Sequence, residues 1–146
     1  MSVARAGGSE RYEFLSVRSL ALVFIGGTLG THMRVLIGVG YGPGGDLYTI
    51  TAVNIVGAFG IGVLAGSVGT APQEGSTNAR WSLLLGTGFF GGFTTYSAFA
   101  LVLALMVSQG GIFLATAFGF GMVVLGAVAT IAGLGVVKLF KAGDAA

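Results

Sequence analysis

The sequence predicts an all-α integral membrane protein with four transmembrane helices, and its composition and charge placement support this prediction. Hydrophobic residues make up 54% of the 146-residue chain, whereas charged residues make up only 8%. In a soluble domain about a quarter of all residues are charged. This chain therefore has too few charged residues to cover a surface that faces water. All charged residues except Arg34, which lies near the end of the first span, fall near the chain ends or in the connections. They leave four apolar segments that each reach the roughly 17 to 25 residues of a span.

The first two spans are predicted at about Ser19 to Val39 and Leu47 to Val68. Both are long enough to cross the hydrocarbon core of a bilayer. Residues 1–18, which precede them, are polar and lack the apolar stretch of a cleavable signal peptide. We therefore expect residues 1–18 to be a cytoplasmic N-terminal extension and the first span to direct insertion.

The third span, predicted at Trp81 to Gln109, is longer than a bilayer needs, which fits a tilted or interrupted helix. Its middle, residues 88–99, combines adjacent glycines with several hydroxyl side chains, which weaken a helix where lipid cannot bond the backbone. Such a break is tolerated only where protein or a water-filled cavity lines it, and the freed carbonyls commonly hold a cation. The sequence therefore predicts a broken third helix beside an ion site.

The fourth span is predicted at Ile112 to Val137; residues 19–140 thus form one four-span domain, and residues 141–146 form a short polar tail. With four spans, both termini and the middle connection share one face of the membrane. That face carries every Lys and Arg except Arg34, so the positive-inside rule places both termini in the cytoplasm of a multi-pass cell-membrane protein. The basic residues on this face are Arg5, Arg11, Arg18, Arg80, Lys138 and Lys141.

Glycine is abundant, with 28 residues that fall largely within the spans. Several small residues recur four positions apart, a spacing that lets helix backbones approach closely in lipid. Four helices are too few to enclose a polar path and also shield it from lipid, so we expect an oligomer, most simply a dimer. The small-residue pairs are Gly26 and Gly30, Gly62 and Gly66, Gly88 and Gly92, and Ala117 and Gly121.

Asn54 is the only asparagine within a predicted span, and its amide needs a partner at that depth. It either forms an interhelical hydrogen bond, worth about 1 kcal/mol, or donates to an anion together with Thr51 on the same helical face. Tyr96 and Phe99 also share a face, and their positive ring edges suit a small anion, although such pairs also serve packing. His32 is open to two interpretations, a proton relay or an interfacial packing residue.

Three motifs follow one another along the chain. Residues 26–34 read GGTLGTHMR, residues 53–59 read VNIVGAF, and residues 91–99 read GGFTTYSAF. They resemble the GG-x-x-GA-x-x-R, VN-x-x-G-x-F and GG-x-TTFSTF motifs of the small fluoride channels called Fluc or CrcB. The likeness covers residues 26–137.

The resemblance implies a four-helix protomer that forms an antiparallel, dual-topology dimer and passively exports toxic fluoride along its interface. It also implies a structural, untransported sodium ion at the dimer centre, held by the backbone carbonyls of Gly91 and Thr94. By position, Asn54 matches the family's pore asparagine and Arg34 its vestibule arginine. The predicted fluoride pathway contains Arg34, Asn54, Thr95, Tyr96, Ser97 and Phe99.

The chain departs from the family pattern at several places. Tyr96 replaces a pore phenylalanine, Ala98 replaces a threonine, and residues 118–122 lack the tyrosine and serines of the family's fourth helix. Dual-topology chains also show little Lys/Arg bias, whereas this chain has a pronounced one. These departures suggest a further hypothesis, in which the chain is the fixed-orientation half of a heterodimer with one degenerate pathway.

Two other functions compete with a channel. A small multidrug exporter would need a membrane-embedded carboxylate, and the predicted spans contain no Asp or Glu. A non-conducting assembly subunit would explain the glycines but not Asn54 beside the third-span break. An enzyme is not expected, because the chain has no cysteine, one histidine and no acid within a span. Nucleic acid is not an expected partner either, because no basic stripe with interleaved aromatics occurs.

Overall fold

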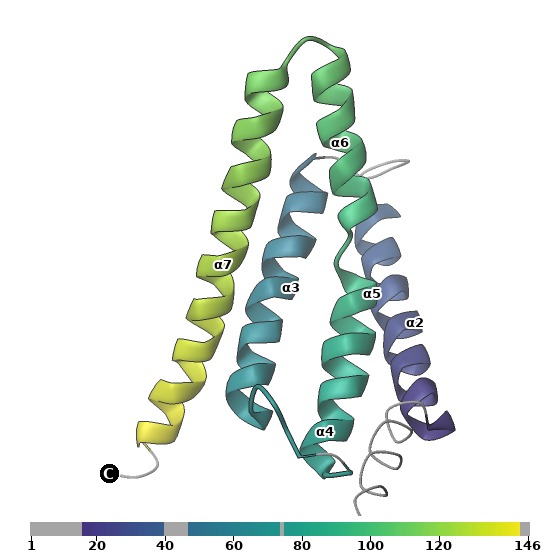
Figure 1. Cartoon of the computed structure of the whole chain (residues 1–146), viewed down its shortest axis with the longest axis vertical. Helices are drawn as coiled ribbons and strands as arrows, with labels where there is room; N and C mark the ends of the chain where they lie inside the picture. The colour runs from purple at the N-terminus through teal and green to yellow at the C-terminus, as the bar shows by residue number, and fades with distance from the viewer. Residues whose placement is uncertain (1–15, 40–46, 74, 144–146) are drawn as a thin grey trace, which may run out of the picture.

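The computed structural model describes residues 16–39, 47–73 and 75–143, and its regular elements there are all helical (Figure 1). The prediction for residues 1–15 of the N-terminal extension lies outside the described residues. Four helices are long and apolar enough to cross a membrane, which confirms the predicted fold class at that level. The elements are α2 (Val17–Val39), α3 (Leu47–Val68), α4 (Thr77–Trp81), η1 (Ser82–Phe90), α5 (Gly91–Phe93), α6 (Tyr96–Ser108) and α7 (Ile112–Gly143).

The helix ends differ little from the predicted spans. α2 begins two residues before Ser19, because the Ser16 Oγ accepts a hydrogen bond from the Ser19 N–H at 3.1 Å and caps the first turn. α3 has the predicted bounds. α7 continues beyond Val137 to Gly143, where cationic side chains suit a helix C-terminus. The Lys141 Nζ there donates to the Gly66 carbonyl at 2.8 Å.

The third span contains a π-helix that the sequence analysis did not predict. η1 covers nine residues, Ser82–Phe90, although π turns mostly occur as single-turn bulges in α-helices. A π turn closes between residues i and i+5, so the residues that follow are rotated relative to a continuous α-helix. This winding therefore sets the direction in which α5 and the following residues face.

Glycine pairs hold α2 against the third span within the protomer. A Cβ added to Gly26 would collide with the Leu84 carbonyl oxygen, and one added to Gly30 would collide with the Phe89 carbonyl oxygen. On the opposite helix, a Cβ at Gly92 would collide with the Gly27 carbonyl oxygen. The predicted close approach of backbones thus occurs at this crossing, where van der Waals contact stabilises packing in lipid.

α3 and α7 form a second tight crossing. A Cβ at Gly62 would collide with the Thr130 carbonyl oxygen, and the Thr130 Oγ1 donates to the Ala58 carbonyl at 3.1 Å. The predicted pair of Ala117 and Gly121 is different, because a Cβ at Gly121 would meet no described atom within 4 Å. That pair therefore contributes no close crossing among the described residues.

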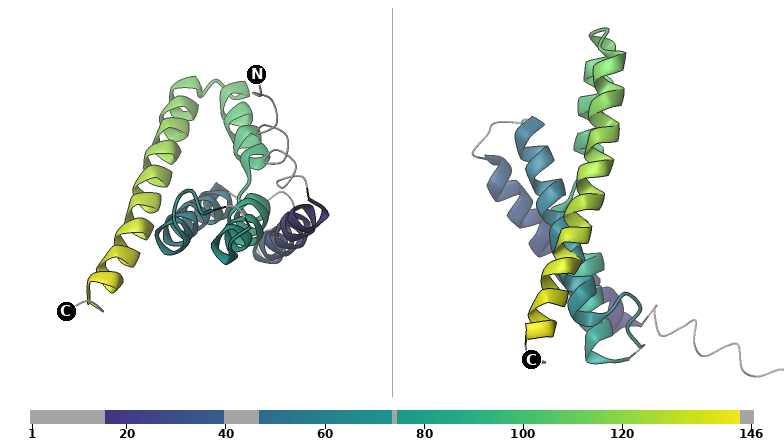
Figure 2. Two further views of the ribbon diagram at one scale, coloured as in Figure 1. Left: turned by 60° about the horizontal axis from the view of Figure 1, so that its bottom comes forward. Right: turned by 90° about the vertical axis from the view of Figure 1, so that its left-hand side faces the viewer.

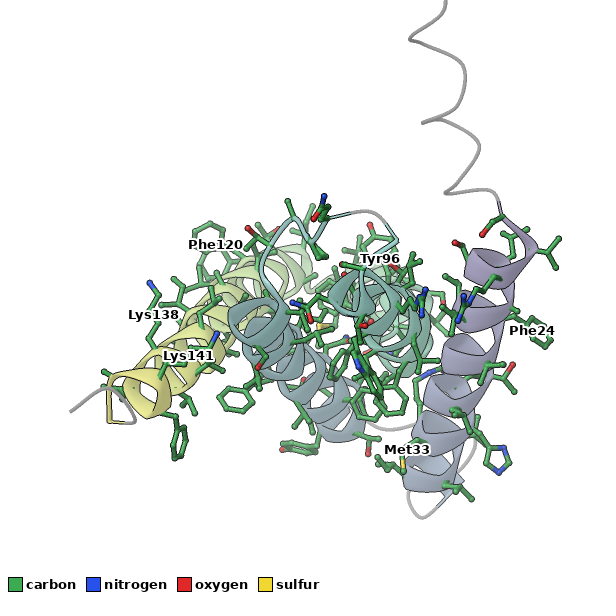
Figure 3. The ribbon with its side chains drawn as sticks, turned by 90° about the horizontal axis from the view of Figure 1, so that it is seen from below. Phe24, Met33, Tyr96, Phe120, Lys138 and Lys141 are labelled. Atoms are coloured by element: carbon green, nitrogen blue, oxygen red, sulfur yellow. The ribbon has the colours of Figure 1, made fainter. Side chains whose placement is uncertain are left out.

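The protomer exposes most of its apolar surface. α6 and α7 form a hairpin that extends beyond α2 and α3 in Figure 1 and diverges from them in the right-hand view of Figure 2. Phe24 projects outward from α2 in Figure 3 and is 75% exposed. Such exposure suits a protein surrounded by lipid or by other subunits. The buried apolar residues are Ile50, Val53, Phe93, Ala115 and Met122.

Candidate ion site in the third span

Thr94 and Thr95 have extended backbone between α5 and α6. Thr94 has φ −74° and ψ 158°, and Thr95 has φ −140° and ψ 113°. Gly91 keeps helical values of φ −62° and ψ −38°. The predicted weak segment combined adjacent glycines with hydroxyl residues; the extended backbone lies at the two threonines, whereas the glycines remain helical.

Asn54 of α3 bonds to both backbone groups of Thr95. The Thr95 N–H donates to the Asn54 Oδ1 at 2.8 Å, and the Asn54 Nδ2 donates to the Thr95 carbonyl at 3.1 Å. The side-chain amide therefore takes the place of helical partners for this residue. An amide NH2 has two hydrogens, and the second has no partner among the described residues.

The hydroxyls beside this bond organise the ends of the two helices. The Thr94 Oγ1 donates to the Phe90 carbonyl at 2.8 Å and so bonds back to the preceding turn at the end of α5. The Thr95 Oγ1 accepts from the Ala98 N–H at 3.3 Å and caps α6, as threonine does at many helix N-termini. It also lies 3.4 Å from the Ser97 Oγ. Thr95 is only 8% exposed, whereas Ser97 is exposed.

Two backbone carbonyls lose their helical donors at this point. In a continuous helix the Thr95 N–H would bond to the Gly91 carbonyl, and the Ala98 N–H would bond to the Thr94 carbonyl. Here those N–H groups bond to the Asn54 Oδ1 and the Thr95 Oγ1. Hard cations prefer oxygen ligands, so both carbonyls have the right chemistry for sodium. The described residues offer no cluster of three or more His, Cys, Asp or Glu as an alternative.

Arg34 binds the carbonyl between these two. Its Nε donates to the Gly92 carbonyl at 3.2 Å, and the Thr31 Oγ1 donates to the same oxygen at 3.3 Å. Arg34 thus closes the C-terminal end of α5, whereas the resemblance assigns it to a vestibule. The sequence analysis did not identify Thr31, although its spacing of three residues from Arg34 places both on one face of α2.

Replacing Arg34 by alanine is expected to lower the free energy of unfolding by about 1.5 kcal/mol, because a charged donor to a partly buried carbonyl is lost. The measurement is thermal or denaturant unfolding of the purified protein in detergent. Lys138→Ala is the matched control, since that ammonium group is exposed and has no hydrogen-bond or ion-pair partner among the described residues. Equal stability of the two variants would contradict this role for Arg34.

A line of aromatic rings leads from the start of α6 to α7. Tyr96 is 82% exposed, and its ring centroid lies 6.4 Å from that of Phe99. The Phe99 ring lies 5.8 Å from that of Phe118 at an angle of 47°. Tyr96, Ser97 and Phe99 therefore gather on α6 beside the Asn54–Thr95 bonds. His32 is exposed on α2 and has no hydrogen-bond partner among the described residues.

The three sequence motifs lie on α2, on α3 and from α5 into the start of α6, and they fall within a known family. The family model described as CrcB-like protein, Camphor Resistance (CrcB), matches residues 21–134. The chain belongs to the CrcB-like family. The match extends from α2 into α7 and includes Asn54 and the interruption at Thr94 and Thr95.

Curated relatives of this CrcB-like chain are named as fluoride-specific ion channels. The protein named "Fluoride-specific ion channel FluC" from Phenylobacterium zucineum is 43% identical over 122 residues, which cover 81% of this chain and 94% of the relative. The protein of the same name from Caulobacter vibrioides is 38% identical over 122 residues, with the same coverage. "Fluoride-specific ion channel FluC 2" from Leifsonia xyli is 38% identical over 124 residues, covering 80% of this chain and 81% of the relative.

Proposed function

We propose that this chain is a fluoride channel of the cell membrane that passively exports fluoride from the cytoplasm and so lowers its toxicity. The observation that carries the proposal is the interrupted third span, where Asn54 holds Thr95 beside exposed hydroxyl and aromatic groups. Its membership of a family whose relatives are named fluoride-specific channels supports the same reading. These relatives are named as channels, which agrees with the expectation that the chain is not an enzyme.

Fluoride is small and strongly hydrated, so a selective path replaces the hydrogen bonds that water provides. The second Nδ2 hydrogen of Asn54 and the hydroxyl of the exposed Ser97 donate hydrogen bonds to fluoride. The buried Thr95 Oγ1 lies within hydrogen-bond distance of the Ser97 Oγ and positions that hydroxyl. The positive edge of the Phe99 ring bridges the apolar gap between donors. Each contact is weak enough for the ion to leave, which conduction requires.

The pathway is completed by a second subunit of inverted topology. Tyr96 and Ser97 are exposed on the single protomer, so one subunit does not enclose the path. An antiparallel partner places two interrupted spans against each other and shields both from lipid. The partner is either a second copy of this chain or a sister chain in a heterodimer.

The charge pattern supports a fixed orientation. The N-terminal end of α2, α4 and the C-terminal end of α7 lie at the same end of the molecule in Figure 1. The described basic residues Arg18, Arg80, Lys138 and Lys141 belong to these segments. The positive-inside rule then places this end, and both termini, at the cytoplasmic face. A chain fixed in this way would need an inverted sister chain, which is the heterodimer hypothesis.

A structural sodium ion fits the centre of such a dimer. The Gly91 and Thr94 carbonyls of each subunit, freed from their helical donors, supply uncharged hard ligands. When bound, the ion would contribute a fixed positive charge at the subunit boundary. The bonds of Asn54 to Thr95 and the cap that the Thr95 Oγ1 forms on α6 keep the Gly91 and Thr94 carbonyls in place.

Fluoride loss from liposomes that contain only this chain is the direct test. Fluoride is expected to leave quickly and chloride to stay, whereas protein-free liposomes retain both ions. Equal loss of fluoride and chloride would overturn the proposal. Fluoride loss that appears only after a sister chain is added would identify the heterodimer, and efflux of cationic drugs instead of fluoride would identify an exporter.

Removing sodium from both sides of the liposomes tests the cation separately. We expect fluoride loss to slow and to recover when sodium is restored, because the carbonyls at the subunit boundary would otherwise repel one another. Potassium at equal ionic strength is the control. Unchanged fluoride loss without sodium would refute the structural ion and leave the channel assignment intact.

A further inference from the structure

Two arginines line a cavity between the N-terminal end of α2 and the start of the third span. The cavity has a volume of about 520 Å³. It lies at the end of the molecule that also carries Lys138 and Lys141. None of the described residues that line it is acidic. The lining that matters here is Ser16, Arg18, Leu22, Arg80, Ser82 and Leu83.

Neither arginine side chain bonds to another residue in the part of the chain that the structure describes. The guanidinium groups of Arg18 and Arg80 have no hydrogen-bond or ion-pair partner among the described residues. The other basic side chains that bond to the protein do so through carbonyls, as Arg34 does to Gly92 and Lys141 to Gly66. Guanidinium presents a planar fork of donors that matches the oxygens of a phosphate group. Two such groups at one cavity therefore have the chemistry to bind a phosphate anion.

The cavity changes from polar to apolar along α2 and the third span, away from the end of the molecule. Arg18 lies in the first turn of α2, and Leu22 lies one turn deeper on the same helix. On the third span, Arg80 of α4 precedes Leu83 of η1 in the same inward direction. A charged mouth thus leads to an apolar floor between two membrane helices.

The position of the mouth along the two helices suits the level of the lipid headgroups. The apolar span of α2 begins at Val17, beside Arg18. Trp81, next to Arg80, is 47% exposed, and exposed tryptophans are enriched at the boundary between membrane and water. Basic pockets between membrane helices on the cytoplasmic side are known to bind anionic headgroups.

We propose that this cavity binds one anionic phospholipid, whose phosphate lies between Arg18 and Arg80 and whose glycerol and upper acyl chain cover Leu22 and Leu83. The apolar floor favours a lipid over free phosphate, because a free ion would leave those leucines uncovered. The bound lipid contacts both α2 and η1 and so reinforces their crossing. The inference does not depend on fluoride conduction, because lipid binding is measured directly.

Native mass spectrometry of the full-length protein in detergent tests the site, with phosphatidylglycerol and phosphatidylcholine added in separate titrations. We expect preferential retention of phosphatidylglycerol. The double variant Arg18→Gln/Arg80→Gln should weaken phosphatidylglycerol binding roughly thirtyfold, since each basic group contributes a similar share at a membrane surface. The control, Lys138→Gln/Lys141→Gln, removes the same charge at the same end and should bind within about threefold of the wild type, because those exposed charges are screened.

The other possible results of this experiment each support or overturn the lipid proposal. Equal binding of the two lipids, or equal loss in the lysine and arginine variants, would overturn it. Displacement of phosphatidylglycerol by millimolar inorganic phosphate would replace the lipid with a free ion. Arg18→Lys/Arg80→Lys should restore part of the binding, and the single variant Arg80→Gln substitutes for the double variant if that one does not fold. Fluoride efflux of the same variants is measured in parallel. A variant that loses fluoride efflux but keeps its lipid binding contradicts the fluoride proposal and not the lipid proposal.

Discussion

Replacing Asn54 by aspartate is expected to abolish fluoride permeation. In the wild type, the Asn54 Oδ1 accepts from the Thr95 N–H, and the Nδ2 donates to the Thr95 carbonyl. Aspartate keeps the acceptor but turns the donor into a second oxygen, which faces the Thr95 carbonyl without a hydrogen. It also removes the remaining Nδ2 hydrogen that we assign to fluoride. The change therefore disturbs the interruption and places a negative charge beside the path of an anion.

The size of the effect follows from the repulsion between the two charges. Two like charges about 4 Å apart repel by about 4 kcal/mol at an effective dielectric constant near 20. That energy corresponds to a loss of roughly three orders of magnitude in fluoride flux, because each 1.4 kcal/mol is a factor of ten.

The measurement for this variant is fluoride efflux from liposomes with matched amounts of folded protein. Asn78→Asp is the matched control, since Asn78 is exposed on α4 and its Nδ2 bonds only to the Val68 carbonyl. We expect Asn78→Asp to conduct as the wild type does. Normal flux through a folded Asn54→Asp variant would remove Asn54 from the pathway.

The four spans could be predicted from the sequence because membrane insertion depends on length and hydropathy, which are local properties. Leu47–Val68 has the predicted bounds, and Val17–Val39 differs by only two residues at its start. The fourth helix runs past the predicted end at Val137 to Gly143, and Lys141 in its last turn suits a helix C-terminus and donates to the Gly66 carbonyl. Where charged residues extend a helix past its apolar part, hydropathy alone therefore places the end of the helix too early.

The partners of the polar groups could not be predicted in the same way. The sequence left Asn54 with two interpretations, and the structure shows a bond between α3 and Thr95 that leaves the second Nδ2 hydrogen without a partner among the described residues. Arg34 and Thr31 meet at the Gly92 carbonyl only because α2 crosses the third span closely. The π-helical winding of residues 82–90, which orients that carbonyl, has no recognisable pattern in the sequence. Long-range contacts and an unusual winding therefore determine the site.

The close crossing of α2 and η1 links these features, and glycine makes it possible. With Gly26 and Gly30 in contact with the backbone of the third span, Arg34 reaches Gly92 at the next turn of α2. A larger residue at the crossing would push α2 away and break this bond. The same displacement would widen the cavity between Arg18 and Arg80. The candidate ion site and the proposed lipid site thus depend on one helix contact.

Replacing Gly26 by valine should therefore destabilise the protein by about 3 kcal/mol or more, because overpacking against backbone cannot be relieved by a side-chain rotation. A Cβ at this position would collide with the Leu84 carbonyl oxygen and would also lie 2.8 Å from the Phe89 nitrogen. We expect loss of the monodisperse protein in detergent or a large fall in its unfolding temperature.

Gly38→Val provides the control for this prediction, since Gly38 belongs to the same helix and a Cβ there would meet no described atom within 4 Å. Both variants make the same chemical change in a helix, so the difference between their unfolding temperatures isolates the contact with the third span. Equal unfolding temperatures would show that α2 can move away from η1 at little cost. In that case the bond between Arg34 and Gly92 could not depend on the glycine crossing.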